Sequence, residues 1–216
     1  MNTRLVAVLW LASIGGCATV VERPPAPDAR AAWSARNEQL APIDAWELYG
    51  RVALQSQTDG WSASLRWVRD ADRHDIDLTG PLGSGHVRLR QDASGAELRD
   101  SEHKVLRDSN AESLLFRATG WLLPVDGLNY WVLGLPAPGG ANDVQIDRWG
   151  RPQRISQHGW QVQYLDYAQF GRYELPSRLF LKRRLERAEA PAAADEPVTL
   201  EVRLVVDRWA LKSSKQ

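Results

Sequence analysis

The sequence predicts a mainly β fold, formed by one antiparallel sheet of about ten strands with a few helices. Three observations support this prediction. Apolar and polar residues alternate with a period of two over most of the chain, short turn motifs separate the alternating segments, and only brief stretches have a helical period. This pattern is typical of half-buried antiparallel strands joined by hairpins. The length of 216 residues suits a single domain with a sizeable core.

The N-terminus has the form of a secretory leader. Arg4 precedes an apolar run from Leu5 to Ile14, which is too short to span a bilayer because spanning takes roughly twenty residues. The run ends in Gly15-Gly16-Cys17, and Cys17 is the only cysteine. This pattern resembles the lipobox of bacterial lipoproteins, in which the cysteine is lipidated and the chain is cut just before it. We therefore predict a signal peptide over residues 1–16 and a covalent lipid on Cys17; the alternative is a leader that happens to contain a cysteine.

The residues after Cys17 predict a tether and then a helix. Ala18 follows the cysteine, and in lipoproteins of this kind the absence of Asp at that position favours the outer membrane. The prolines of residues 21–27 exclude helix and sheet, so residues 17–27 are expected to form an acylated tether. Asp28 can cap a helix that runs through Ala41 and ends at Pro42. Residues 28–216 are expected to form the single domain.

Two-residue alternation predicts the strands of that domain. They cover residues 46–55, 61–67, 74–79, 87–90, 97–99, 104–106, 144–147, 153–157, 160–167, 178–181 and 200–207. Asn110 can cap a short helix through Thr119, with Gly120 as its stop. Residues 128–133 could form a helix or a strand, because their periodicity does not decide. Residues 183–197 are charged and then rich in Ala and Pro, which predicts an exposed loop insertion.

The chemistry-bearing residues argue against several classes of function. The 27 Lys and Arg residues balance 27 Asp and Glu, which is not the charge of a nucleic-acid-binding surface. None of the four histidines is at metal-ligand spacing from another, so no metal site is predicted. The glycines of residues 80–85 are followed by neither a lysine nor a helix, which excludes a P-loop. We predict no catalytic residue and no cofactor other than the lipid on Cys17.

The chain has more apolar residues than two helices can cover. A sheet with one apolar face must be covered or curved around a hollow, so a partly closed barrel with helices as a lid would accommodate the surplus. An ordinary filled core is the alternative. The candidates for the wall of an apolar cavity share one strand face: Trp46, Leu48, Val52, Leu54, Leu65, Trp67, Ile76 and Leu78. Leu114 and Leu115 are the candidates for the lid.

The turn Gly80-Pro81-Leu82-Gly83 has an aliphatic residue where a solvated tip is expected. Proline and the flanking glycines suit a tight turn in which Leu82 points outward. The alternative is a leucine folded back into the core as a plug. An outward leucine on a membrane-tethered protein would be well placed to enter lipid.

The chain resembles the LolB family, the outer-membrane lipoprotein receptors of Gram-negative bacteria. The resemblance covers most of the mature chain and depends on an ordered set of motifs, since no one of them would suffice. They are the lipobox Cys17, the strand from Trp46 to Val52, the Trp61-to-Trp67 strand, the Gly80-to-Gly83 loop, Leu123-Pro124, residues 130–136 (YWVLGLP), residues 157–160 (QHGW) with Tyr164, Leu175-Pro176 and Trp209.

The resemblance implies a half-open antiparallel β-barrel of about ten to eleven strands with an α-helical lid over an apolar cavity. It also implies a lipid-anchored protein on the periplasmic face of the outer membrane, which accepts acylated lipoproteins from the soluble carrier LolA and inserts them into the inner leaflet. Leu82 matches the protruding leucine that the family uses for membrane insertion. We expect a monomer whose partners are LolA, acylated cargo and outer-membrane lipid. A scaffolding lipoprotein and a lipid-modifying enzyme are the alternatives.

Overall fold

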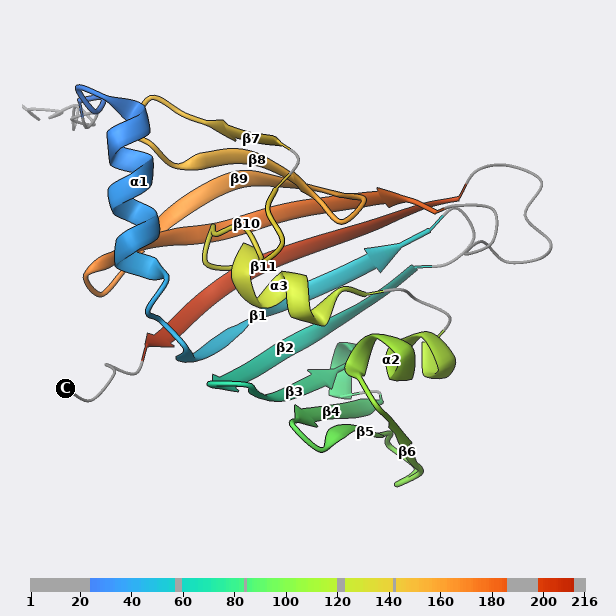
Figure 1. Ribbon diagram of the computed structural model, residues 1–216. Helices are drawn as coiled ribbons and strands as arrows, with labels where there is room; N and C mark the ends of the chain where they lie inside the picture. The colour runs from blue at the N-terminus through green and yellow to red at the C-terminus, as the bar shows by residue number, and fades with distance from the viewer. Residues whose placement is uncertain are drawn as a thin grey trace, which may run out of the picture.

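The computed structural model describes residues 24–56, 60–83, 85–119, 123–141, 143–185 and 198–211, and within them it has one antiparallel sheet and three α-helices (Figure 1). The strands are β1 (Ala45–Gln55), β2 (Gly60–Asp70), β3 (Arg73–Thr79), β4 (His86–Asp92), β5 (Gly95–Arg99), β6 (Val105–Asp108), β7 (Asp143–Ile146), β8 (Pro152–Gln157), β9 (Trp160–Phe170), β10 (Tyr173–Arg184) and β11 (Thr199–Leu211). The helices are α1 (Ala29–Leu40), α2 (Ala111–Thr119) and α3 (Val125–Trp131). Each predicted strand has a counterpart, which confirms the mainly β prediction.

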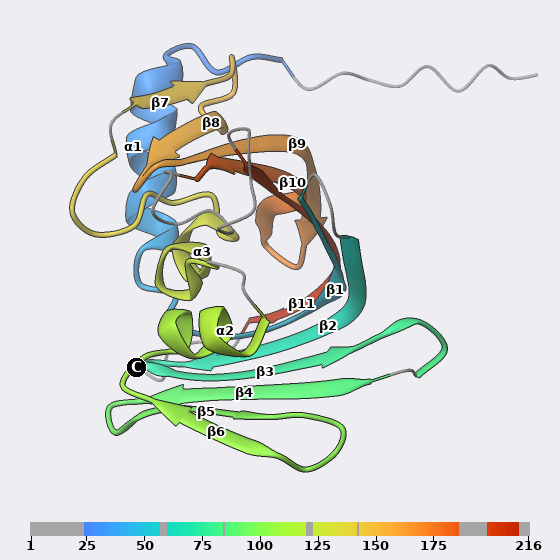
Figure 2. The ribbon, with the colours of Figure 1, turned by 90° about the vertical axis from the view of Figure 1, so that its right-hand side faces the viewer.

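The strand order is β6-β5-β4-β3-β2-β1-β11-β10-β9-β8-β7. The chain steps outward from β1 to the edge strand β6, crosses through α2 and α3 to the opposite edge at β7, and steps back to β11 beside β1. Figure 2 shows the sheet curving around α2 and α3. In the described part of the chain the edges β6 and β7 do not pair, so the barrel is half-open as predicted.

The strand registers place the apolar residues on the concave face. Trp67 pairs with Ile76, Ile76 with Leu89 and Leu89 with Leu98, so one row of apolar side chains crosses four strands. Their neighbours along each strand point to the convex face and are mostly charged or polar, as alternation requires. The concave side therefore holds the core, and the convex side faces solvent.

The predicted caps are present at two helices. The carboxylate of Asp28 accepts hydrogen bonds from the backbone N–H groups of Arg30 (2.8 Å) and Ala31 (3.1 Å), which starts α1. The side chain of Asn110 accepts one from the N–H of Ser113 at 2.8 Å, which starts α2. The expected stop at Gly120 lies outside the described residues.

The segment that periodicity left undecided is helical at its start. Residues 128–131 complete α3, and buried residues follow in a tight turn through Leu135. The indole N–H of Trp131 donates to Gln157 at 3.0 Å, and the hydroxyl of Tyr164 donates to the Trp131 carbonyl at 3.1 Å. These contacts fix α3 inside the curve of the sheet.

The structure describes the start of the predicted loop at residue 183 and the last residues of the predicted tether. Arg183 and Arg184 belong to β10, where they pair with Leu200 and Thr199, so the prediction that the loop begins at residue 183 is wrong. The pairing of β10 with β11 extends the sheet further than the charged sequence indicated. Residues 186–197 lie outside the described residues. In the tether, residues 24–27 have neither helix nor strand, and the N–H of Ala26 donates to the Arg148 carbonyl at 2.9 Å.

Candidate functional site

The turn between β3 and β4 is the most exposed apolar point among the described residues. Pro81–Gly83 form one turn of 3-10 helix, closed by a hydrogen bond from the N–H of Gly83 to the Gly80 carbonyl at 3.1 Å. The N–H of Gly80, which is buried, donates to the Gly85 carbonyl at 3.0 Å. The Leu82 side chain is fully exposed, so the outward orientation is the one adopted and the plug is not.

Leu82 is unfavourable for the fold in two ways. Its backbone is left-handed (φ 56°, ψ 25°), which costs a residue with a Cβ about 1–2 kcal/mol. Its side chain also forgoes burial that would contribute about 1.5–3 kcal/mol. Neither feature serves the stability of the chain itself, which is the mark of a residue kept for contact with something outside it.

A shallow groove of about 600 Å³ lies on the convex face next to this turn. Its lining includes the small side chains of Ala53, Ser62 and Ser64, the turn residues Gly80 to Gly83, and the arginines Arg51 and Arg203. Both arginines are exposed and already paired, with Asp207 at 3.0 Å and Glu201 at 2.9 Å respectively. The groove is therefore lined by neutral small groups and flanked by satisfied charges.

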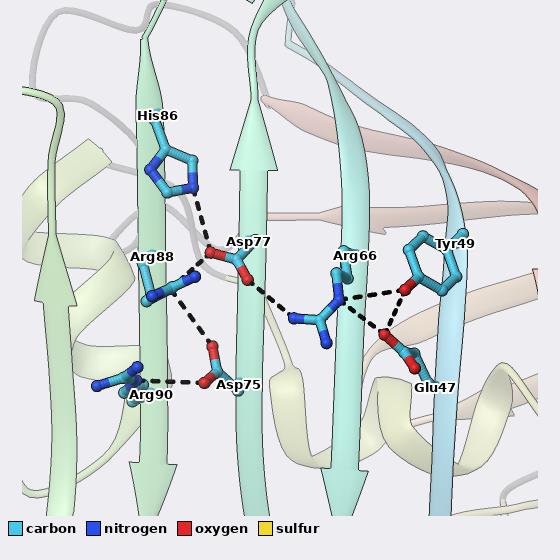
Figure 3. Close-up of polar contacts among 8 residues, drawn as sticks. All are labelled: Glu47, Tyr49, Arg66, Asp75, Asp77, His86, Arg88 and Arg90. Atoms are coloured by element: carbon cyan, nitrogen blue, oxygen red, sulfur yellow. Dashed lines mark hydrogen bonds and ion pairs between the residues drawn. The ribbon is translucent and has the colours of Figure 1, made fainter. Parts of the chain in front are cut away.

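The convex face of β1 to β4 has a ladder of ion pairs (Figure 3). Asp77 lies at its centre and accepts from Arg88 at 2.6 Å and from Arg66 at 3.3 Å, with His86 at 3.1 Å. Burial alone would raise the pKa of Asp77, but the hydrogen bond and charge of Arg88 outweigh it and hold the pKa below its usual value. This ladder holds the strands on either side of the exposed turn together.

The ladder continues toward both neighbouring strands. Asp75 accepts from Arg90 at 3.2 Å, and Arg66 donates to Glu47 at 2.7 Å. The hydrogen bond from Tyr49, followed by the contacts of Arg66, lowers the pKa of Glu47. Sequence reasoning missed this network, although strands with charges of opposite sign at directly opposed positions could have indicated it.

The eight predicted wall residues do share the concave face. Leu48 pairs with Trp67, Leu65 with Leu78 and Trp67 with Ile76, so they lie on one side of three adjacent strands. The set divides by burial. Six are buried: Trp46, Leu48, Leu54, Leu65, Trp67 and Ile76. Val52 and Leu78 are only partly buried, as is Val87 on the next strand.

Burial is uneven along the concave face, since partly buried Val52 lies between buried Leu48 and Leu54 on β1. Trp46 makes edge-to-face contacts with Trp67 and Trp209, each with 5.1 Å between ring centroids, which fills the end where β1 begins. At the opposite end, where Val52 and Leu78 lie, Trp61 is exposed over more than a third of its surface. Leu78 is near the end of β3, which leads into the Leu82 turn.

The lid candidates lie on α2, which packs against β4, β5 and β6. Leu114 and Leu115 are both buried, while Phe116 on the same helix is exposed over 42% of its surface. The helix therefore contributes apolar side chains to the core and leaves one aromatic ring in solvent at the rim.

Three other features to compare with the structure are the lipid on Cys17, metal sites and membrane-spanning helices. Cys17 lies outside them, so the lipid site stays a prediction. Within the described ranges, no group of three or more His, Cys, Asp and Glu side chains is placed to hold a metal ion. None of the helices in that part of the chain combines the length and apolar character needed to cross a membrane.

Sequence reasoning also missed a buried polar anchor. The carboxamide of Gln157 accepts from the Trp131 indole at 3.0 Å and the Ala137 N–H at 2.9 Å, and donates to the Ala137 and Gly140 carbonyls at 2.8 and 2.9 Å. A glutamine at an inward position of an alternating strand was the available signal. Its role is to hold the segment after α3 against β8.

Comparison with known proteins finds one family model and several relatives that match this chain. The model of the family described as "Outer membrane lipoprotein LolB" matches residues 44–209. The outer-membrane lipoprotein LolB of Nitrosococcus oceani is 35% identical over 207 residues, covering 95% of this chain and 96% of that protein. The LolB protein of Pseudomonas putida strain GB-1 is 40% identical over 149 residues, covering 69% of this chain and 73% of that protein.

Among solved structures, an outer membrane lipoprotein-sorting protein domain from Vibrio parahaemolyticus aligns with 88% of this chain and 95% of its own. The sequence identity is 10% and the TM-score 0.47.

Proposed function

This chain belongs to the LolB family of outer-membrane lipoproteins, and on that premise we propose that it accepts acylated lipoproteins from the periplasmic carrier LolA and inserts them into the inner leaflet of the outer membrane. The observation that carries the proposal is the pairing of an apolar concave face under α2 and α3 with a fully exposed leucine at the adjacent turn. The first feature suits acyl chains, and the second suits entry into a bilayer.

The lipid on Cys17 would hold the protein at the membrane. The acyl chains of a lipidated cysteine each contribute about 0.8 kcal/mol per buried methylene, so several chains form a firm anchor. Residues 17–27 then separate this anchor from the domain, which begins at the cap of α1. The anchored domain keeps Leu82 within reach of the same leaflet.

Acyl chains would enter beside the Leu82 turn, where partly buried apolar side chains lie on the concave face. Val52, Leu78 and Val87 leave apolar surface there, whereas Trp46 and its aromatic neighbours pack the other end. Movement of α2 away from β4 to β6 would expose more of this face, with Leu114 and Leu115 as the side chains that separate from it. Each acyl chain would replace contacts that these leucines make in the empty protein.

Transfer would need no nucleotide. Cargo moves from the carrier if the receiving cavity binds acyl chains better than the donor does, and it then moves on because the bilayer buries the chains completely. Leu82 would lower the barrier of the second step by placing apolar surface in the lipid first. Its location outside the concave face separates it from the uptake step.

Two steps can be measured with purified components. We expect a form that begins at Ala18 to take a lipoprotein from loaded LolA, since the sheet and all three helices lie between residues 29 and 211. If the protein takes no cargo under conditions where another LolB protein does, the proposal is wrong. Binding of a protein partner without any uptake of cargo would instead favour the scaffolding function.

A further inference from the structure

A second hollow, which we call the mouth pocket, lies between α3, the start of β3 and the turn from β8 to β9. It has a volume of about 600 Å³, within the range of about 300–1,000 Å³ that is usual for ligand sites. Its lining includes Arg69 and His74 from β2 and β3, Asn129 from α3, Trp160 from β9 and Arg183 from β10. It is thus built by elements from both halves of the sheet together with α3.

Three buried polar atoms of residues that line the mouth pocket have no partner. The side-chain oxygens of Asn129 and Gln91 and the indole N–H of Trp160 make no hydrogen bond to any residue that the structure describes. Asn129 is 6% exposed and Trp160 is 2% exposed. Leaving such groups unpaired destabilises a fold, so a ligand that pairs with them would be favoured.

Neighbouring indoles show that the fold can satisfy such groups elsewhere. Trp131 donates to Gln157 at 3.0 Å, and Trp67 donates to His74 Nδ1 at 3.2 Å. The mouth pocket therefore combines two unused acceptors and one unused donor. A secondary amide offers the complement of one acceptor and the donor, because its N–H can donate to Asn129 and its carbonyl can accept from Trp160.

The charges of the mouth pocket fit a neutral polar ligand. Arg69 and Arg183 contribute positive charge, while Glu112, Asp126 and Asp72 contribute negative charge. The N–H group of Gln91 donates to Asp126 at 3.3 Å, and burial raises the pKa of Glu112. Because both signs are present around the unpaired groups, neither a simple anion nor a simple cation is favoured.

We propose that the mouth pocket binds the backbone amides of the peptide that follows the acylated cysteine of a cargo lipoprotein. The inference rests on the proposed function, since it assigns the polar part of the same cargo. His74 joins the two regions, because it lines the mouth pocket and accepts a hydrogen bond from Trp67 of the concave face. Cargo whose acyl chains lie on that face can thus place its first peptide bonds against Asn129 and Trp160.

The test uses the chain from Ala18 to Gln216 and two synthetic probes. One is a dipalmitoylglyceryl-cysteinyl tetraserine amide, and the other is the same acylated cysteine as its methyl ester. Displacement of an apolar fluorescent dye gives both dissociation constants. We expect the wild type to bind the peptide probe more tightly than the ester.

Trp160→Phe removes the indole donor and keeps an aromatic side chain, so it should weaken the peptide probe about 5- to 30-fold and leave the ester unchanged. Asn129→Leu should do the same from the acceptor side. Trp209→Phe is the matched control, because Trp209 also has a buried, unpartnered indole N–H but does not line the mouth pocket. It should not change the preference for the peptide.

Three outcomes would overturn the inference. The first is equal binding of both probes by the wild type, and the second is an equal loss for both probes in Trp160→Phe. The third is a loss of binding to phosphatidylethanolamine in Trp160→Phe with the peptide probe unaffected, which would assign the pocket to a lipid headgroup. Failure of the wild type to bind either probe would refute the proposed function as well, and so is distinguishable.

Discussion

Replacing Leu82 with asparagine separates the stability of the fold from delivery of cargo to the membrane. Asparagine tolerates the left-handed backbone better than leucine does, so the free energy of unfolding should stay the same or rise by up to about 1 kcal/mol. The Leu82 side chain is fully exposed, so its whole burial energy of about 1.5–3 kcal/mol is available for contact with lipid. Since about 1.4 kcal/mol is a factor of ten, its loss should slow delivery about 10- to 100-fold.

The assay loads the protein with a fluorescent lipoprotein, mixes it with liposomes and follows the transfer. Uptake from LolA and urea unfolding are measured on the same preparations. Leu165→Asn is the matched control, because Leu165 is a leucine exposed over 57% of its surface in β9, away from the turn. Equal slowing of delivery in both variants, or loss of uptake together with delivery in Leu82→Asn, would refute the reasoning.

Three further predictions concern stability. Burial lowers the pKa of His74 from 6.5 to about 4, so the unfolded state takes up a proton first and the free energy of unfolding should fall by up to about 1.4 kcal/mol per pH unit from pH 6.5 toward 4. His74→Asn, which keeps an acceptor but does not titrate, should flatten this slope in urea titrations. Asp77→Asn should lower the free energy of unfolding by about 1–2 kcal/mol at pH 7, discounted because the paired arginines are partly exposed. Its pKa is depressed, so that difference should disappear once acid protonates Asp77 in the folded wild type. Gly50→Ala should cost about 3 kcal/mol, because the added Cβ would lie 2.1 Å from the Val205 carbonyl oxygen, whereas Gly60→Ala, with its nearest atom at 3.9 Å, should change stability by less than about 0.5 kcal/mol.

Each of these predictions has a result that contradicts it. An unchanged acid slope in His74→Asn would mean that other groups titrate in that window. A stability difference for Asp77→Asn that persists in strong acid would show that packing, not charge, is involved. Similar unfolding midpoints for Gly50→Ala and Gly60→Ala would show that β1 can move away from β11.

Much of the architecture follows from local sequence. The alternation located all eleven strands, and Asp28 and Asn110 marked the starts of α1 and α2 because their side chains can bond the free N–H groups of a first turn. The segment at residues 128–131 escaped this reasoning. Asn129 and Trp131 are buried while Leu128 and Tyr130 are only partly buried, and four residues are too few to show a helical period.

The features of the candidate site also divide into those that local sequence predicts and those that the tertiary structure decides. Local sequence predicted the strands, the shared face of the eight wall residues and the unusual leucine in a Gly-Pro turn, since these depend on neighbours along the chain. The choice of a half-open barrel over an ordinary filled core came only from the resemblance to the LolB family. Tertiary structure decided that Leu82 points outward, that six wall residues are buried while Val52 and Leu78 are only partly buried, and that Asn129 and Trp160 line one hollow. The physical reason is that burial and unpaired hydrogen-bonding groups depend on which distant segments meet, and the crossing of α2 and α3 between the two sheet edges brings those segments together.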